Sequence, residues 1–241
     1  MTATSIKILV INPNSTKEMT KSIEFEINTL HISQCVEIDY YTGPTHTRKA
    51  APPSINNNED AEQSTQACLQ DFQENPKYLE YDGYLIACYS DHPLVYQLPK
   101  LLSSQRVVMG IFQASMLYSM QYATSGCKTA ILTSSIAWEK LLDDAIIKYC
   151  GNVDVFPDAR FNHSLACNIP VLELHHEKHF PVIQNKITQL QNNNVGIILL
   201  GCAGLSCLHQ KMKRFAPNIK FVDSVKVGIK LLIAYVDIGE T

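Results

Sequence analysis

Two segments of the sequence indicate the fold most clearly: YLIACYSDHP (84–93) and IILLGCAGLS (197–206). Each is an apolar run, typical of a buried parallel strand, that reaches a cysteine and then small or polar residues. In open parallel sheets, ligands bind just beyond the carboxyl ends of the strands. Two such ends, far apart in the sequence and alike in composition, predict two similar halves that face each other across a cleft.

The rest of the chain alternates between strand and helix patterns. The other predicted strands are KILVIN (7–12), CVEIDYYT (35–42), VVMGIF (107–112), TAILTSS (129–135), VDVFPDA (153–159) and IKFVDS (219–224). Amphipathic helices are predicted after residue 15 and over 59–73, 93–103, 113–124, 136–149, 175–192, 205–215 and 225–236. This alternation is typical of an α/β fold with mainly parallel sheets.

The residues at the strand ends repeat in the same order along the chain. In each half, the first strand ends in polar residues, and a later strand ends at a cysteine. We therefore expect two lobes related by a pseudo-twofold axis, one formed by residues 1–113 and 219–241 and the other by 114–218. Residues 43–58 form a loop rich in Pro, Asn and Thr. A loop of this length inside a compact domain is typical of a lid or binding loop.

Composition excludes several classes of function. The 241 residues are 46% hydrophobic and 18% charged, as in ordinary globular proteins. The net charge of −3 gives no electrostatic footprint for nucleic acid or acidic membranes. With no signal-peptide pattern, no apolar run long enough to span a bilayer and eight cysteines without a CxxC pair, we expect a cytoplasmic protein with free thiols. We expect it to act on a small molecule and to form a homo-oligomer.

Cys88 and Cys202 are the candidate catalytic residues. A thiol at a strand end that faces a helix start is expected to have a lowered pKa. Of two thiols on opposite walls of a cleft, one can remove a proton from a carbon stereocentre while the other delivers a proton to the opposite face. Such chemistry needs no metal or cofactor if a neighbouring carbonyl finds hydrogen-bond donors. The alternative for each cysteine taken singly is a small buried core residue.

Polar or small residues beside both thiols and at two further strand ends are the candidate substrate-binding residues: Asn14, Ser15, Tyr89, Ser90, Thr133, Ser134, Ala203 and Gly204. Helix starts after Asn14–Ser15–Thr16 and Thr133–Ser134–Ser135 would suit an oxyanion or carboxylate. The alternative for Ser15 is a capping box with Glu18, and the alternative for Asp91 is a helix N-cap.

No motif supports a metal or nucleotide cofactor. His175, His176 and His179 form an HHxxH cluster, but the zinc signature H-E-x-x-H is absent and no third ligand follows from the spacing. We interpret the cluster as a surface helix end and predict no metal site. Dinucleotide-binding, P-loop and serine-nucleophile motifs are absent as well.

Three motifs, ILVINPNSTKEMT (8–20), IACYSDHP (86–93) and LLGCAGL (199–205), together resemble the hydantoin racemases of the aspartate/glutamate racemase superfamily, and most of all a fungal branch associated with allantoin breakdown. The resemblance continues at PPSINNNED (52–60), GIFQAS (110–115) and FVDSV (221–225). It implies two Rossmann-like lobes, an active site between them, and cofactor-independent racemisation by cysteines that match Cys88 and Cys202. It also implies substrate contacts from Asn14, from the residues after each cysteine, and from Thr133 and Ser134.

The sequence departs from the family pattern at two places. Family members typically read C-F-G-D-P-G after the first cysteine, whereas this chain has Ser90 for the glycine and adds His92; Gln113 stands where an acid is usual. The sequence thus predicts a racemase of 5-substituted hydantoins, with allantoin favoured. The alternatives are another amino-acid-derivative racemase or a decarboxylase of the superfamily, or a regulatory protein that binds a metabolite without turnover.

Overall fold

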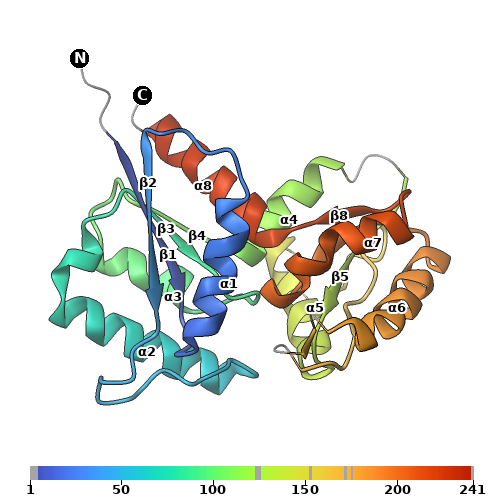
Figure 1. Ribbon diagram of the computed structural model, residues 1–241, viewed down its shortest axis with the longest axis horizontal. Helices are drawn as coiled ribbons and strands as arrows, with labels where there is room; N and C mark the ends of the chain where they lie inside the picture. The colour runs from blue at the N-terminus through green and yellow to red at the C-terminus, as the bar shows by residue number, and fades with distance from the viewer. Residues whose placement is uncertain (1–4, 123–125, 152–153, 171–172, 175, 240–241) are drawn as a thin grey trace. The chain divides into compact units, whose positions relative to one another are not determined.

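The computed structural model describes residues 5–122, 126–151, 154–170, 173–174 and 176–239 (Figure 1). The chain forms two compact units. The first comprises Met1–Ile111 with Gly228–Thr241, and the second comprises Phe112–Val227.

The first unit contains a four-stranded parallel sheet with the order β2 (Val36–Thr42), β1 (Ile6–Asn12), β3 (Gly83–Ile86) and β4 (Val107–Gly110). Ile11 of β1 lies opposite Ile86 of β3, and the Ala87 N–H donates to the Ile11 carbonyl over 2.8 Å. The register therefore places the residues that follow β1 beside the residues that follow β3.

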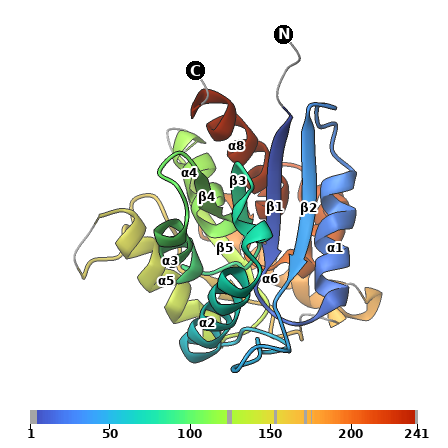
Figure 2. The ribbon, with the colours of Figure 1, turned by 90° about the vertical axis from the view of Figure 1, so that its left-hand side faces the viewer.

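Helices cover both faces of this sheet: α1 (Lys17–Asn28), α2 (Asn58–Glu74), α3 (Leu94–Gln97) and α8 (Ser224–Gly239), with 3₁₀ turns η1 (Pro76–Leu79) and η2 (Leu98–Leu101). One face buries Ile11 and Ile86 against Phe72 of α2. On the other face, a Cβ at Gly83 would lie 2.9 Å from Val236 of α8, so helix and sheet are in close contact. Helix α1 packs beside the edge strand β2 (Figure 2).

The second unit repeats this strand order in a second parallel sheet: β6 (Leu165–Ala166), β5 (Lys128–Thr133), β7 (Val195–Leu200) and β8 (Lys220–Val222). Its helices are α4 (Ile111–Tyr122), α5 (Ala137–Tyr149), α6 (Phe180–Asn192) and α7 (His209–Phe215), with 3₁₀ turns η4 (Glu177–His179) and η5 (Ala203–Leu208). Leu132 and Leu200, which lie opposite each other, pack on Ile187 of α6 and Met212 of α7.

The α/β class with two mainly parallel sheets is confirmed, whereas the pseudo-twofold relation between the lobes stays a prediction. The strand predicted over 153–159 is wrong for its described residues, because Pro157 has no N–H and Asp154 adopts a φ of 61°. The second sheet instead uses the two-residue strand β6.

The last strand also differs from expectation. We expected residues from 219 onward to return to the first lobe, but β8 pairs with β7, and the chain joins the first unit at Gly228 within α8. Gly228 packs closely on the first sheet, since a Cβ there would lie 3.0 Å from Leu85 of β3. Within the described ranges, no helix has the length and apolar character that a membrane span requires.

Candidate active site

Asn14 follows β1 and lies in a buried amide network. Its Oδ1 accepts from the Thr16 N–H and from Asn12 Nδ2, both over 3.0 Å. Because a backbone N–H can only donate, this contact fixes which end of the Asn14 amide is oxygen. The Asn14 NH₂ group then faces the sulfur of Met19 at 3.4 Å, a weak acceptor, so it retains capacity to donate to a ligand.

The helix start next to Asn14 differs from the expected anion site. The Ser15 N–H donates to the Pro52 carbonyl over 2.9 Å, and the Thr16 N–H is held by Asn14. The N-cap of α1 is Thr16, without a side-chain capping bond, so the Ser15–Glu18 capping box, the alternative for Ser15, does not form. Donation to a ligand therefore falls to the Asn14 side chain, and a ligand contact from the Ser15 side chain stays a prediction.

The long loop after β2 is fixed to the end of β1. The Gly43 N–H donates to the carbonyls of Asn12 and Asn14 over 2.8 and 2.9 Å. A Cβ at Gly43 would lie 2.3 Å from the Pro13 carbonyl oxygen, so only glycine fits there. Further along the loop, the Thr16 hydroxyl donates to the Pro53 carbonyl over 2.6 Å. Part of this loop therefore lies directly beside the candidate binding residues.

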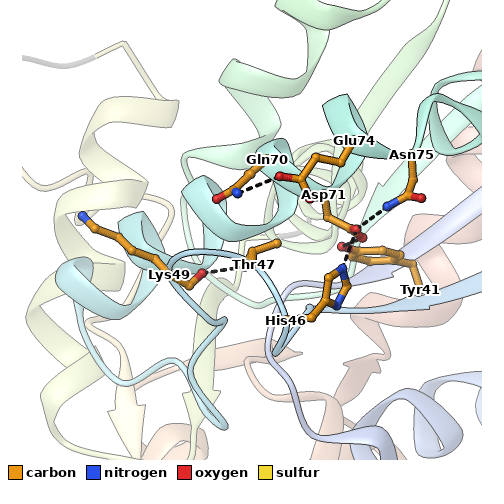
Figure 3. A network of polar contacts seen from close by, with 8 residues as sticks. All are labelled: Tyr41, His46, Thr47, Lys49, Gln70, Asp71, Glu74 and Asn75. Atoms are coloured by element: carbon orange, nitrogen blue, oxygen red, sulfur yellow. Dashed lines mark hydrogen bonds and ion pairs between the residues drawn. The ribbon is translucent and has the colours of Figure 1, made fainter.

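A buried carboxylate holds the same loop on α2 (Figure 3). Asp71 accepts from the Tyr41 hydroxyl over 2.7 Å, from Asn75 Nδ2 over 2.8 Å and from His46 Nε2 over 3.0 Å. Burial raises the pKa of Tyr41, which keeps its hydroxyl protonated as a donor. Strand β2, the loop and α2 thus form one connected support for the end of β1.

Cys88 follows β3 and is half-buried. Its sulfur lies 3.6 Å from the Ser90 hydroxyl, and the Ser90 N–H donates to the Cys88 carbonyl over 3.1 Å. Tyr89 and Ser90 are buried beside it. Asp91 is not the N-cap of α3, a position that Pro93 occupies; it accepts instead from the Tyr96 hydroxyl.

His92 is completely buried at the end of the same turn. The Leu94 N–H donates to Nδ1 over 3.2 Å, so the proton of the neutral ring is on Nε2, which donates to Ser64 Oγ over 3.0 Å. Ser64 in turn donates to the Ala61 carbonyl over 2.9 Å. Burial lowers the pKa of His92 to about 4, against the opposing charge of Asp91. In the sequence, His92 stands out only as a departure from the family pattern, because no sequence pattern marks Ser64 as its partner.

In the second unit, Cys202 follows β7 at the start of η5 and is buried. We expected this position to lower its pKa, but burial raises the pKa of Cys202 to about 11. Hydrogen bonds from the Gly204 N–H and the Ser134 hydroxyl act in the opposite direction and favour the thiolate. The Thr133 hydroxyl donates to the Gly201 carbonyl over 3.2 Å and so ties the end of β5 to the residue before the thiol.

A third thiol lies at this end of the second sheet. Thr133 pairs with Ala166, and the Cys167 N–H donates to the Thr133 carbonyl over 2.8 Å. Cys167 and Cys202 belong to one buried apolar cluster, and burial raises the pKa of Cys167 to about 12. Sequence reasoning assigned Cys167 no role because it missed β6, the strand that brings this residue to the site.

Within each unit, the predicted residues gather at the carboxyl ends of adjacent strands. The first unit holds Asn14, Ser15, Cys88, Tyr89 and Ser90 at the ends of β1 and β3, and the second holds Thr133, Ser134, Cys202, Ala203 and Gly204 at the ends of β5 and β7. The catalytic and binding roles of these residues stay predictions.

The histidine cluster forms no metal centre among the residues that the structure describes. His179 Nε2 pairs with Glu173 over 3.0 Å, and His175 lies outside the described residues. No group of three or more His, Cys, Asp or Glu side chains in the described part of the chain is arranged to hold a metal ion.

Two α/β units with parallel sheets, each with a thiol and polar residues at its strand ends, are typical of proteins that bind small molecules. The Asp/Glu/hydantoin racemase family model matches residues 8–232, and the chain belongs to this family. It is thereby an isomerase of the racemase class, as the sequence predicted.

Comparisons with individual proteins agree with this assignment. The chain is 30% identical to the protein DCG1 of Saccharomyces cerevisiae, over 95% of this chain and 96% of that protein. It is 26% identical to a hydantoin racemase of Pseudomonas sp., over 98% and 88% of the two chains. Its fold matches the allantoin racemase from Klebsiella pneumoniae with a TM-score of 0.77 at 23% identity, over 98% of this chain and 89% of that one.

Proposed function

We propose that the protein racemises a 5-substituted hydantoin without a cofactor, with allantoin as the favoured substrate. The observation that carries the proposal is that Cys88 and Cys202 hold equivalent positions in the two units. Cys88 lies just after β3, which pairs with β1, and Cys202 lies just after β7, which pairs with β5. The likeness to a hydantoin racemase and an allantoin racemase supports it. Cytoplasmic location, homo-oligomeric assembly and a place in purine nitrogen breakdown are parts of the proposal that rest on the sequence.

In the proposed reaction, the thiolate of Cys88 removes the proton from C5 of the ring. The C–H electron pair moves into the C5–C4 bond, and the C4 carbonyl becomes an enolate. The enolate then collapses while C5 takes a proton from the Cys202 thiol on the opposite face. The products are the other enantiomer, a Cys88 thiol and a Cys202 thiolate, and no further reactant is consumed. These reaction steps require the two thiols to face each other across the predicted interlobe cleft.

The surroundings of Cys202 support its role as the acid. With a pKa near 11, Cys202 is a protonated thiol at neutral pH and therefore suits the acid. As it loses its proton, the Gly204 N–H and the Ser134 hydroxyl stabilise the thiolate. The Asn14 NH₂ group suits a substrate carbonyl, because it has a donor to offer and its oxygen is already engaged.

The uncharged character of the candidate binding residues favours a neutral substrate. Asn14, Ser90 and Thr133 are buried, and none of the predicted substrate-binding residues carries a charge. A free amino acid would bring an ammonium and a carboxylate, whose desolvation is costly without opposite charges nearby. A neutral cyclic imide loses less hydration and matches hydrogen-bonding groups. This argues for hydantoins over the amino-acid racemase alternative.

The test is racemisation of (R)- and (S)-allantoin in D₂O, followed by optical rotation and by mass spectrometry of each separated enantiomer. The two-base mechanism predicts deuterium in the product enantiomer while recovered substrate keeps its protium. Glutamate, aspartate and 5-methylhydantoin, run in parallel, separate a hydantoin racemase from an amino-acid racemase. Because allantoin racemises unaided, the protein-free rate is subtracted, and no rate above it on any hydantoin would refute the proposal.

The two thiols are tested by Cys88→Ser and Cys202→Ser. Each is expected to lower the racemisation rate at least a thousandfold, since a serine hydroxyl is a far weaker acid than a thiol. Cys35→Ser, at an exposed thiol of the first unit, is the matched control and should leave the rate unchanged. A Cys88 or Cys202 variant with near-wild-type turnover would remove that residue from the mechanism.

A further inference from the structure

We propose that His92 is a positioning residue that holds the Cys88 turn against α2, and that the tether from His92 to Ser64 fixes where the Cys88 sulfur lies. This proposal rests on the proposed function for its catalytic consequence. The contacts on which it stands belong to the first unit alone.

The turn after β3 (87–92) carries Cys88. It leaves the sheet at Ala87, whose N–H still donates to Ile11, and the next backbone bond is the tight contact from Ser90 N–H to Cys88 carbonyl. Neither bond links the turn to a helix. Tyr89 and Ser90, the predicted substrate contacts, lie in the same short segment.

His92 supplies a link at the far end of the turn. Through Nδ1 it accepts the Leu94 N–H at the first residue of α3, and its backbone carbonyl accepts the Val95 N–H over 3.0 Å. Through Nε2 it reaches Ser64 in the middle of α2. One side chain thus satisfies the start of α3 and ties it to a helix 28 residues away in the sequence.

Helix α2 is a firm anchor for this link. It also holds the long loop through Asp71 and His46, and the Gln63 side chain donates to the Ala50 carbonyl over 2.7 Å. The Cys68 sulfur lies 3.9 Å from the Pro13 carbonyl just after β1. The His92–Ser64 bond therefore connects the turn that carries Cys88 to the helix that also supports the Asn14 side of the site.

His92 suits a fixed structural link better than proton transfer. Both ring nitrogens are engaged, and neither His92 nor Ser64 is exposed to solvent. Its contacts require one neutral tautomer with the proton on Nε2, and the remaining lone pair, on Nδ1, already accepts the Leu94 N–H. A turn that reads C-F-G-D-P-G, the pattern typical of the family, has no histidine at this point and so lacks this link.

Three variants separate the two ends of the link. Ser64→Ala removes the hydroxyl on α2 and leaves the turn sequence intact. His92→Asn keeps an acceptor for the Leu94 N–H but cannot reach Ser64, whereas His92→Gln keeps a donor that can reach Ser64. Thr65→Val is the matched control, because the buried Thr65 hydroxyl donates to the same Ala61 carbonyl as Ser64 but does not hydrogen-bond His92.

The readouts are kcat and KM for racemisation, the pH profile of Cys88 alkylation by iodoacetamide, and hydrogen exchange of the Ser90–Val95 amides. We expect Ser64→Ala and His92→Asn to lower kcat at least tenfold with KM changed less than threefold, to shift the alkylation profile, and to speed amide exchange at least tenfold. His92→Gln should restore much of the kcat, the alkylation profile and the slow amide exchange, and Thr65→Val should resemble the wild type in all three.

The proposal would be overturned if Ser64→Ala had the same kcat and the same Cys88 alkylation profile as Thr65→Val and the wild type, even if both variants melt at a lower temperature. If the wild-type protein racemises no substrate, the proposed function fails, but alkylation and exchange still decide whether His92 positions Cys88. If His92→Asn does not fold, Ser64→Ala gives the answer, because it retains the histidine.

Discussion

Ser134→Ala removes the hydroxyl that hydrogen-bonds the Cys202 thiol and leaves the Gly204 N–H as its other donor. Burial already raises the pKa of Cys202 to about 11, so this thiolate depends strongly on the donors that remain. A hydrogen bond to a charged group is worth about 1.5–3 kcal/mol. Since 1.36 kcal/mol corresponds to one pKa unit, the variant should raise the pKa of Cys202 by about one to two units.

The assay is alkylation of Cys202 by iodoacetamide between pH 7 and 10, read by mass spectrometry of the peptide that contains it. Below its pKa, a thiol reacts in proportion to its thiolate fraction. The rate in Ser134→Ala should therefore fall about ten- to a hundredfold at each pH. Racemisation should fall at least tenfold as well, because the Cys202 thiolate forms during the proposed reaction.

Ser135→Ala is the matched control, since the Ser135 hydroxyl accepts from the Ala137 N–H over 3.3 Å at the start of α5. Its alkylation profile should match the wild type. If Ser134→Ala and Ser135→Ala react at the same rate as the wild-type protein at every pH, the reasoning about the Cys202 environment is refuted. Reaction of Cys167, measured on the same samples, reports whether the variant has opened the buried cluster.

Three further perturbations test other parts of the first unit. Asn14→Asp puts a carboxylate where the site offers an NH₂ donor, so KM for a hydantoin should rise at least tenfold in steady-state kinetics, while the exposed Asn28→Asp should leave KM unchanged. Asp71→Asn leaves one buried donor without an acceptor and should cost about 1–3 kcal/mol of stability in thermal melts. The control is Asp144→Asn at an exposed carboxylate, and equal melting temperatures of the two variants would contradict the Asp71 network. The pKa of His92 is about 4 in the folded protein against the ordinary 6.5, so the buried neutral ring stabilises the fold above pH 6.5. This contribution is lost as the pH falls to 4, where the free energy of unfolding should be lower by about 3 kcal/mol. Denaturant titrations at pH 7 and pH 4 should show the gap between wild type and His92→Asn narrowing by that amount, and a constant gap would argue against a buried neutral ring.

Sequence periodicity determined most of the fold, because buried strands and amphipathic helices have different hydrophobic periods. The helix predicted over 59–73 is α2 (Asn58–Glu74), and the strand predicted over 35–42 is β2 (Val36–Thr42). The weak elements failed for physical reasons. β6 has two residues, too few for a pattern, and the three-residue β8 carries no mark of the sheet that it joins.

The candidate site was predictable where chemistry lies at a strand end. Apolar runs that stop at Cys88 and Cys202 have a meaning in any parallel sheet, so the position of both thiols followed from the sequence. The capping box at Ser15 failed because α1 begins one residue later, with Thr16 as its N-cap, and because the Pro52 carbonyl takes the Ser15 N–H that Glu18 would have bound. Local motifs of this kind compete for the same donors, and only the folded backbone decides between them.

Tertiary structure alone decided the environment of each group. The sequence placed Cys202 at a helix start and predicted a lowered pKa, but the burial that raises it comes from residues spread over the second unit. It gave no sign that Ser64 would meet His92, or that Cys167 would share a cluster with Cys202. Hydrophobic period is a property of neighbouring residues, whereas desolvation and side-chain hydrogen bonds depend on which distant segments the fold brings together.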